Sequence, residues 1–226
     1  MDSVRKVGQS SRWKQGLHRS LPFVLVALFS GCAGRHPEVD FSQGIDPSQL
    51  RGLRESIHPN VGEWRQTELG FTNFIPPEVG PQDVMRATGG AGVSLGVADG
   101  FSARDLTLSA RMSFEGTGAP CLVFRVTEEA GVIGSMYSVA VFSSGLNLGC
   151  LTPKGWRLIE HVSVPVPPYV PHDVVVTVKG DRIRAELDRQ QVLDVRERTL
   201  TKPGGAGICG REGPCFFRSL QLRGLD

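Results

Sequence analysis

The chain has few of the features that mark nucleic-acid-binding, metal-dependent or membrane-spanning proteins. Its 25 Lys and Arg nearly balance 23 Asp and Glu, and without the residues before Cys32 the balance is 20 to 22. A chain so close to neutral lacks the basic surface that nucleic acids require. No His-x-x-x-His, His-Glu or Cys-x-x-Cys pair is present, so neither a metal site nor a cofactor is predicted. The nine-residue apolar run at 21–29 is too short for a membrane-spanning helix, which needs about 20 residues.

The sequence after residue 60 also lacks the 3.6-residue periodicity of helices and any long repeat. It has a period of two instead. Residues 172–195 hold three runs with apolar side chains at every second position, separated by polar turns at 179–181 and 188–191. Residues 105–114 alternate in the same way, which predicts half-buried strands. Further short strands are expected at 121–125, 136–142, 146–151, 156–164 and 215–222. An all-β antiparallel sandwich follows.

The N-terminus has the layout of an export signal. Residues 1–20 are polar and basic, and the apolar run 21–29 is followed by Ser-Gly-Cys32. Phe29-Ser-Gly-Cys32 resembles the bacterial lipobox, although Phe29 stands where Leu is usual. The resemblance implies that acyl chains such as palmitate are attached to Cys32, since stable anchoring takes two or more chains. The alternative is a plain signal peptide, in which Cys32 is an ordinary cysteine.

The residues after the cysteine bear on location and domain boundaries. Ala33 stands where an aspartate would favour retention in the inner membrane, so the lipoprotein resemblance implies the outer membrane as partner and location. Residues 32–60 are polar and are expected to form a lipidated tether, in which 48–57 fit one short helix capped by Asp46 or Ser48. We expect a signal peptide at 1–31, this tether, and one sandwich domain at 61–226.

Five strand motifs follow one another along the chain: Asp105-Leu-Thr-Leu-Ser-Ala-Arg-Met-Ser-Phe114, Leu122-Val-Phe-Arg125, Lys179-Gly-Asp-Arg-Ile-Arg184, Gly205-Ala-Gly207-Ile208 and Phe217-Arg218. Their order resembles a known fold family, the concanavalin A-like lectin/glucanase jelly roll. Within it, the chain is most similar to bacterial laminin-G-like domains and to domains grouped with 3-keto-disaccharide hydrolases. The resemblance covers about residues 61–226 and implies a jelly-roll β-sandwich. Arg189 departs from the family, whose hairpin often has glycine there.

An even number of cysteines remains once Cys32 is assigned to lipid, namely Cys121, Cys150, Cys209 and Cys215. In an exported chain this favours two disulfides. One pairing clips Cys209 to Cys215 across a short segment and leaves Cys121 with Cys150. The alternative joins Cys121 to Cys209 across neighbouring strands.

Catalytic motifs are weak. Glu186-Leu-Asp188 resembles part of the carboxylate signature of glucanases with this fold, but Gln191 stands where the last carboxylate is needed. A retaining mechanism requires two carboxyl groups about 5–5.5 Å apart. The segment is equally explained by a strand that ends in a polar turn, so no catalytic residue is predicted.

Sugar binding is the more open hypothesis. An aromatic face suits the apolar side of a sugar ring, and planar polar groups suit its hydroxyls. We assign Trp156 and Tyr137 as candidate faces and Arg125 as the polar fork, with Trp64 and Tyr169 as lesser candidates. Glu128 and Glu129 either bind calcium or form a solvated acidic loop.

The sequence therefore predicts a lipid-anchored envelope protein with a non-catalytic glycan-binding sandwich. A hydrolase acting on disaccharides or 3-keto-glycosides is the alternative, implied by the family resemblance. A structural or protein-interaction domain is the second alternative.

Overall fold

The computed structural model describes residues 36–55, 63–74 and 94–225. The chain divides into two units, of which the second, residues 35–226, contains all the described residues. The expected signal peptide and the lipidated Cys32 lie outside the described residues. No helix within the described ranges is long and apolar enough to cross a membrane. The described fold belongs to the second unit.

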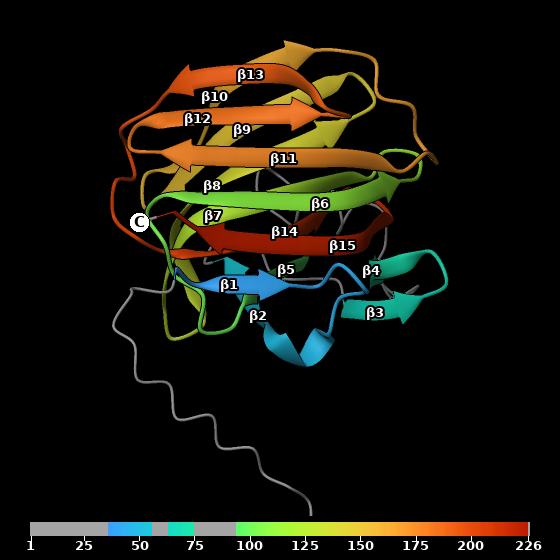
Figure 1. Ribbon diagram of the computed structural model, residues 1–226, viewed down its shortest axis with the longest axis horizontal. Coiled ribbons are helices and arrows are strands. Elements are labelled where there is room, and N and C mark those ends of the chain that lie inside the picture. Colours follow the sequence, from blue (N-terminus) through green and yellow to red (C-terminus); the bar gives the residue numbers. More distant parts are fainter. Residues whose placement is uncertain (1–35, 56–62, 75–93, 226) are drawn as a thin grey trace, which may run out of the picture. The chain divides into compact units, whose positions relative to one another are not determined.

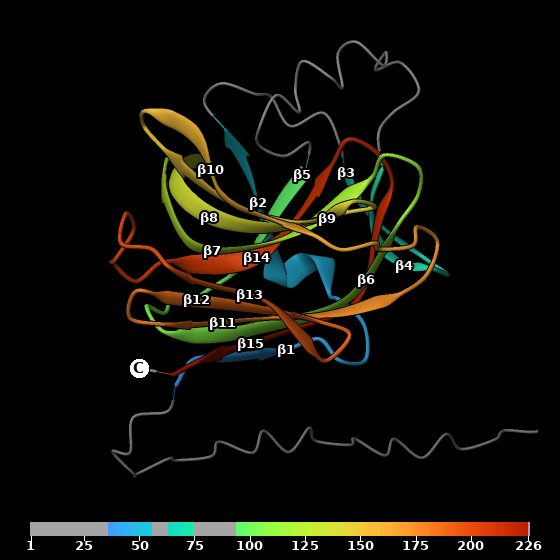
Figure 2. The ribbon, with the colours of Figure 1, turned by 90° about the horizontal axis from the view of Figure 1, so that it is seen from above.

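Two largely antiparallel sheets face each other and form a β-sandwich (Figures 1 and 2). The expected all-β jelly-roll class is thus confirmed. Sheet A runs in the order β13 (Gln190–Arg196), β12 (Arg182–Leu187), β11 (His172–Lys179), β6 (Leu106–Phe114), β15 (Cys215–Gly224), β4 (Gly70–Phe74) and β3 (Glu63–Thr67), with β1 (Glu38–Asp40) also beside β15. Sheet B runs in the order β10 (Gly155–Ser163), β9 (Gly145–Thr152), β8 (Val132–Phe142), β2 (Leu50–Glu55), β5 (Ser94–Ala98), β14 (Gly205–Arg211) and β7 (Ala119–Glu129).

The three strands predicted within residues 172–195 are confirmed as β11, β12 and β13. The valines at every second position of β11 are fully buried in the core between the sheets. The turn between β12 and β13 consists of Asp188 and Arg189, with φ of 48° and 69°. A hairpin turn with positive φ at both residues has type I′ geometry. Arg189 therefore takes a left-handed conformation that costs a non-glycine residue about 1–2 kcal/mol.

Side-chain contacts hold this turn. The Asp188 carboxylate accepts hydrogen bonds from Nδ1 of His172 at 2.7 Å and from the backbone N–H of Asp173 at 2.9 Å. Nε2 of His172 lies 2.9 Å from the Pro167 carbonyl oxygen. Both ring nitrogens of His172 thus lie next to oxygen atoms, one of the turn and one of the preceding loop.

The segment expected to be a tether differs in the structure. From residue 38 to 55 it contributes two strands, because β1 pairs with β15 and β2 pairs with β5. Phe41 and Ile45 are buried in the main core. Only a few apolar residues, spaced irregularly among polar ones, pack this segment against the core. The sequence therefore has no periodic pattern there that would predict a strand.

The helix expected at 48–57 is also absent from the described part of that range. A single 3-10 turn, Pro47–Gln49, is followed directly by β2. Asp46 caps the turn, as its carboxylate accepts from the Ser48 N–H at 2.9 Å. The capping signal was correct, but the residues after it entered a sheet.

Sheet B closes on itself and encloses a second apolar cluster. β7, β8, β2, β5 and β14 are paired in a ring, completed by the parallel pairing of Arg54 with Val132 and Glu55 with Ile133. The outward-facing side chains of these strands pack together within the ring. Their buried members are Leu53, Leu95, Val97, Cys121, Val123, Val126, Ile133, Met136, Ala140, Leu151 and Cys209.

The four cysteines of the sandwich are buried and no disulfide joins them, so neither expected pairing is present among the described residues. Cys121 and Cys209 belong to the second cluster, whereas Cys150 and Cys215 belong to the main core. The pairings Cys121–Cys150 and Cys209–Cys215 would each have to join a cysteine of the second cluster to a cysteine of the main core. Cys121 and Cys209 are direct cross-strand neighbours. Residue counting cannot tell which face a cysteine occupies.

Candidate functional site

A groove of about 250 Å³ lies on the outward face of sheet B. Strands β8, β9 and β10 form its floor and β14 supplies one wall. Side chains on a strand alternate between the two faces of the sheet. The pairing register therefore brings together, in this groove, the side chains that point outward from each strand. The lining residues are Ser138, Ala140, Asn147, Gly149, Trp156, Leu158 and Arg211.

Trp156 owes its position to a glycine on the neighbouring strand. A Cβ atom at Gly149 would lie 2.6 Å from Cζ3 of the indole, which is closer than packed carbon atoms approach. The indole therefore lies over β9 only because residue 149 has no side chain. Leu158, two residues along β10, is 60% exposed and forms an apolar rim.

Arg211 lies against the indole. Its Cζ is 4.6 Å from the centroid of the Trp156 ring, a cation–π contact. Nε and Nη2 of Arg211 and Nε1 of Trp156 are shielded from solvent and have no hydrogen-bond partner within the described part of the chain. Leaving such donors unpaired costs about 1–3 kcal/mol each, and more for a charged group. The groove thus holds three donors that fold stability alone would not place there.

A polar row continues along the groove on β9 and β10. Nδ1 of His161 lies 2.7 Å from Oδ1 of Asn147, and its Nε2 lies 3.0 Å from Oγ of Ser163. All three residues lie on the face that carries Trp156, because His161 pairs with Asn147 across the two strands. Neutral groups that both donate and accept hydrogen bonds are suited to sugar hydroxyls.

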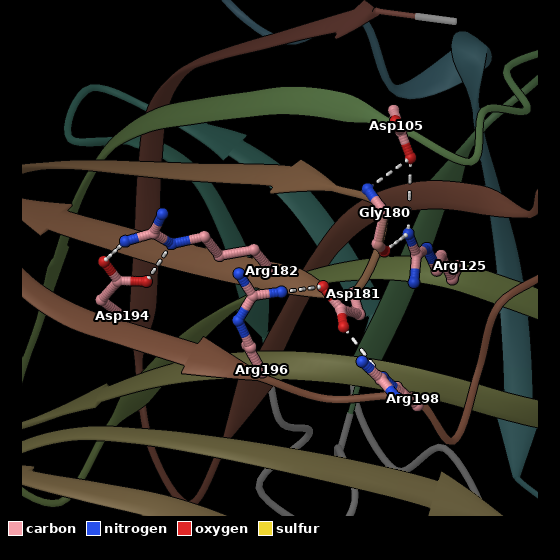
Figure 3. A network of polar contacts seen from close by, with 8 residues as sticks. All are labelled: Asp105, Arg125, Gly180, Asp181, Arg182, Asp194, Arg196 and Arg198. Carbon is pink, nitrogen blue, oxygen red and sulfur yellow. Dashed lines mark hydrogen bonds and ion pairs between the residues drawn. The ribbon is translucent and has the colours of Figure 1, made fainter.

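Of the three predicted ligand residues, only Trp156 lines the groove. Arg125 is 1% exposed and donates to the carbonyl oxygen of Gly180 at 2.6 Å (Figure 3). It also donates to the carbonyl oxygens of Arg104 at 3.0 Å and Leu200 at 2.6 Å. Its Nη2 also lies 3.6 Å from Oδ1 of Asp105. A guanidinium enclosed in this way fixes loop ends and has no surface left for a ligand.

Tyr137 is likewise inside the main core. Its ring is fully buried against Phe124, and its hydroxyl accepts a hydrogen bond from the Leu200 N–H at 2.8 Å. Burial raises the pKa of the phenol above its ordinary value. The structure therefore corrects the assignment of Tyr137 and Arg125 as surfaces that a ligand touches directly.

The remaining sequence candidates lie apart from the groove. Trp64 stacks on Phe71 with ring centroids 5.0 Å apart. Tyr169 is 67% exposed, in the loop between β10 and β11. Glu128 forms an ion pair with Arg51. Among the described residues, no three His, Cys, Asp or Glu side chains form a group that could hold a metal ion.

A second cavity, of about 280 Å³, lies on the outward face of sheet A. Its charges are extensively paired, as Figure 3 shows. Nε and Nη2 of Arg182 donate to the two carboxylate oxygens of Asp194 at 2.6 and 2.5 Å. Asp181 accepts from Arg196 and Arg198, each at 2.9 Å. Hydrogen bonds from Arg182 and Arg198 hold the pKa of Asp194 and Asp181, respectively, below the ordinary value.

Sequence reasoning missed Arg211, Asn147 and Gly149. Asn147 and Gly149 had a usable signal, because they share the outward parity of the β9–β10 hairpin with Trp156. Arg211 had none, since its approach to the indole depends on β14 lying beside β7, a long-range pairing.

Comparison with known proteins identifies the architecture. No protein-family model matches the chain, and no curated protein matches it. Among solved structures, the carbohydrate-binding module CBM66 from Bacillus subtilis matches with a TM-score of 0.58 and 17% identity, over 76% of this chain and 99% of that chain. A protein with a galectin-like fold from Bacillus subtilis gives 0.61 and 9%, over 84% and 96%. The Crh5 transglycosylase gives 0.54 and 12%, over 87% of each chain. The sandwich therefore shares the jelly-roll fold of these structures.

Proposed function

We propose that the sandwich is a non-catalytic carbohydrate-binding module and that the Trp156 groove is its binding site. The observation that carries the proposal is the set of unpartnered donors on Trp156 and Arg211 beside the Asn147–His161 pair. Hydroxyl-rich ligands supply many acceptors in a small volume, and so would satisfy these groups. The apolar rim at Leu158 suits the carbon face of a sugar ring.

Two of the similar structures support a sugar ligand by their own descriptions. One is a carbohydrate-binding module and the other a transglycosylase. Because these likenesses establish the fold alone, the residues of the groove carry the assignment to this chain.

The transglycosylase likeness also supports a hydrolase or transferase as the second candidate. Glycoside hydrolysis commonly uses two carboxyl groups, about 5–5.5 Å apart in retaining enzymes and about 6.5–9.5 Å apart in inverting ones. The described lining of the groove contains an arginine and no carboxylate, an arrangement that favours binding over bond cleavage.

A glycan array probed with the full-length protein tests the proposal. We expect binding to a subset of glycans, lost in Trp156→Ala and weakened in Asn147→Ala. Tyr169→Ala is the matched control, because it removes an exposed aromatic residue outside the groove. Thermal melting of each variant separates loss of the site from loss of the fold.

Three results would overturn it. Binding that survives Trp156→Ala in a folded protein would place the site elsewhere. Release of reducing sugar or of a keto-sugar from the bound glycans would favour the hydrolase. No binding to any glycan would favour a structural or protein-interaction role.

We further propose that the protein is exported and anchored through lipid on Cys32, to the outer membrane of a bacterium with two membranes. Support comes from the lipobox resemblance of residues 29–32 and from the need for acyl chains to hold such a domain at a membrane. Metabolic labelling with a palmitate analogue should mark the protein and fail in Cys32→Ala. A Cys32→Ala protein that still takes up label and fractionates with membranes would contradict this anchor.

A further inference from the structure

The unpartnered nitrogens of Arg211 define the chemistry of the ligand more narrowly than a neutral sugar does. Nε and Nη2 lie on the same edge of the guanidinium, with their N–H bonds nearly parallel. This edge is suited to the two oxygens of one carboxylate. Both nitrogens lack a partner, and among the described residues no ion pair joins Arg211 to a carboxylate.

A two-point hydrogen bond between a guanidinium edge and a carboxylate occurs elsewhere in the protein. Arg182 uses the same two nitrogens, Nε and Nη2, to donate to both oxygens of Asp194. On sheet A the protein supplies the anion from a neighbouring strand. On sheet B it supplies the guanidinium and holds it against Trp156 at 4.6 Å, but provides no anion.

The size of the groove limits what can bring that anion. A volume of about 250 Å³ is below the range of about 300–1,000 Å³ that is usual for pockets of drug-sized ligands. The groove is therefore suited to a single sugar unit. Asn147, His161 and Ser138 are placed to meet hydroxyl groups of the same unit.

We propose that the groove binds a sugar that carries a carboxylate, a uronic acid unit of an acidic polysaccharide, and that Arg211 is its specificity-determining residue. The inference rests on the proposed glycan-binding function. On binding, the Arg211 side chain rotates so that its Nε–Nη2 edge, which is shielded from solvent in the structure, faces the groove and pairs with the carboxylate. The remaining groove residues contact the ring and its hydroxyls. Neutral sugars leave the guanidinium unpaired and bind more weakly.

The basic cavity on sheet A is the competing site for an acidic sugar. Its lining carries Lys179, Arg182, Arg184 and Arg196 against Asp181. Most of these guanidinium groups are already engaged by Asp181 and Asp194. A carboxylate arriving there would compete with an internal carboxylate, whereas at Arg211 it would not.

Calorimetric titration of the full-length protein tests the inference. The probes are oligomers of galacturonate, glucuronate and mannuronate, the methyl esters of the same oligomers, and the matching neutral hexose oligomers. We expect one uronate series to bind at least tenfold more tightly than its ester. Arg211→Gln should reduce uronate affinity to that of the ester, and Arg211→Lys should fall between them. Arg184→Gln, which removes a cation from the sheet A cavity, should change affinity less than twofold.

The outcomes separate this inference from the proposed function. Equal binding of uronates, esters and neutral sugars overturns the role of Arg211 and leaves glycan binding intact. A uronate preference that is lost in Arg184→Gln and kept in Arg211→Gln overturns the site. Failure of every oligomer to bind, in a protein that melts cooperatively, overturns both.

Discussion

The outward faces of the two sheets differ in whether their charged side chains are paired within the protein. On sheet A, arginines and aspartates of β12 and β13 and of the adjoining turns pair with one another in the open. On sheet B, the outward face is apolar within the strand ring, and Arg211 reaches the groove without a carboxylate partner. The face with more charged side chains is thus the one on which more of them form ion pairs within the protein. The proposed ligand site is distinguished by Arg211, whose Nε and Nη2 both lack a hydrogen-bond partner among the described residues, and not by the number of its charges.

Arg125 offers the sharpest contrast with Arg211, because both guanidinium groups are shielded and only Arg125 is fully engaged. Replacing Arg125 by Met removes a hydrogen-bond donor from three carbonyl oxygens and a buried cation from the side of Asp105. We expect a loss of about 3–5 kcal/mol in the free energy of unfolding, as for other broken buried ion pairs. Urea denaturation with a fixed m-value measures it.

Arg198→Met is the control for that measurement. Arg198 has a side chain that is 79% exposed, and its loss should change stability by less than about 0.5 kcal/mol. A loss below about 1 kcal/mol in Arg125→Met would show that the hydrogen bonds of the enclosed guanidinium contribute little to stability.

Glu197 extends the comparison to a carboxylate that joins the two sheets at their far edges. It follows β13 and accepts hydrogen bonds from Thr199 and, at 3.0 Å, from Arg157 on β10. Burial alone would raise its pKa, but these hydrogen bonds outweigh burial and lower the pKa to about 2 from 4.5. A depressed pKa contributes stability above the unfolded-state value that is lost as the pH falls toward the folded-state value.

We therefore expect Glu197→Gln to cost about 1–3 kcal/mol at pH 7, somewhat less than the roughly 3.4 kcal/mol to which the whole shift corresponds at 1.36 kcal/mol per pKa unit. The difference from the unmodified protein should shrink between pH 4.5 and 2, the window set by the two pKa values. Urea midpoints at several pH values measure it, with the exposed Glu186→Gln as control. A difference that stays constant with pH would contradict the pKa assignment.

The smallest effects should come from Arg211→Met and Arg182→Met, and their signs should differ. Arg182→Met removes an exposed ion pair and should cost about 0.2–1 kcal/mol. Arg211→Met loses a cation–π contact of about 0.5–1 kcal/mol, but it also removes shielded donors that have no partner. We expect its stability to be unchanged or raised by up to about 2 kcal/mol. Destabilisation of Arg211→Met by more than Arg182→Met would mean that Arg211 is already satisfied.

Local patterns predicted the sheets well. The alternation in residues 172–195 places the valines of β11 in the core because a strand has a fixed period of two. Trp156 was also placed correctly on a surface, since the turn before it and the parity of β10 are both local. The early strands β1 and β2 escaped notice because short polar segments carry too few alternating residues.

Irregular pairing accounts for the misplaced arginine. The register between β7 and β8 shifts after Phe124, so Arg125 leaves the simple alternation and takes φ of 50°. Its carbonyl partners come from loops far apart in the sequence, near Arg104, Gly180 and Leu200. In the sequence, an arginine at the end of an apolar run is typical of an exposed residue at the edge of a sheet. Its burial follows only from the folded positions of the three loops.

The pairing of β1 with β15 sets a constraint on how the chain can be assembled. Asp40 lies opposite Gln221 and Glu38 opposite Arg223, and β15 also separates β6 from β4 in sheet A. A chain that emerges from the ribosome or a transport channel N-terminus first cannot complete sheet A until residue 224 is free. Such long-range closure is slow and leaves strand edges unpaired in the meantime. The nascent chain should therefore depend on a holding chaperone until its last strand arrives.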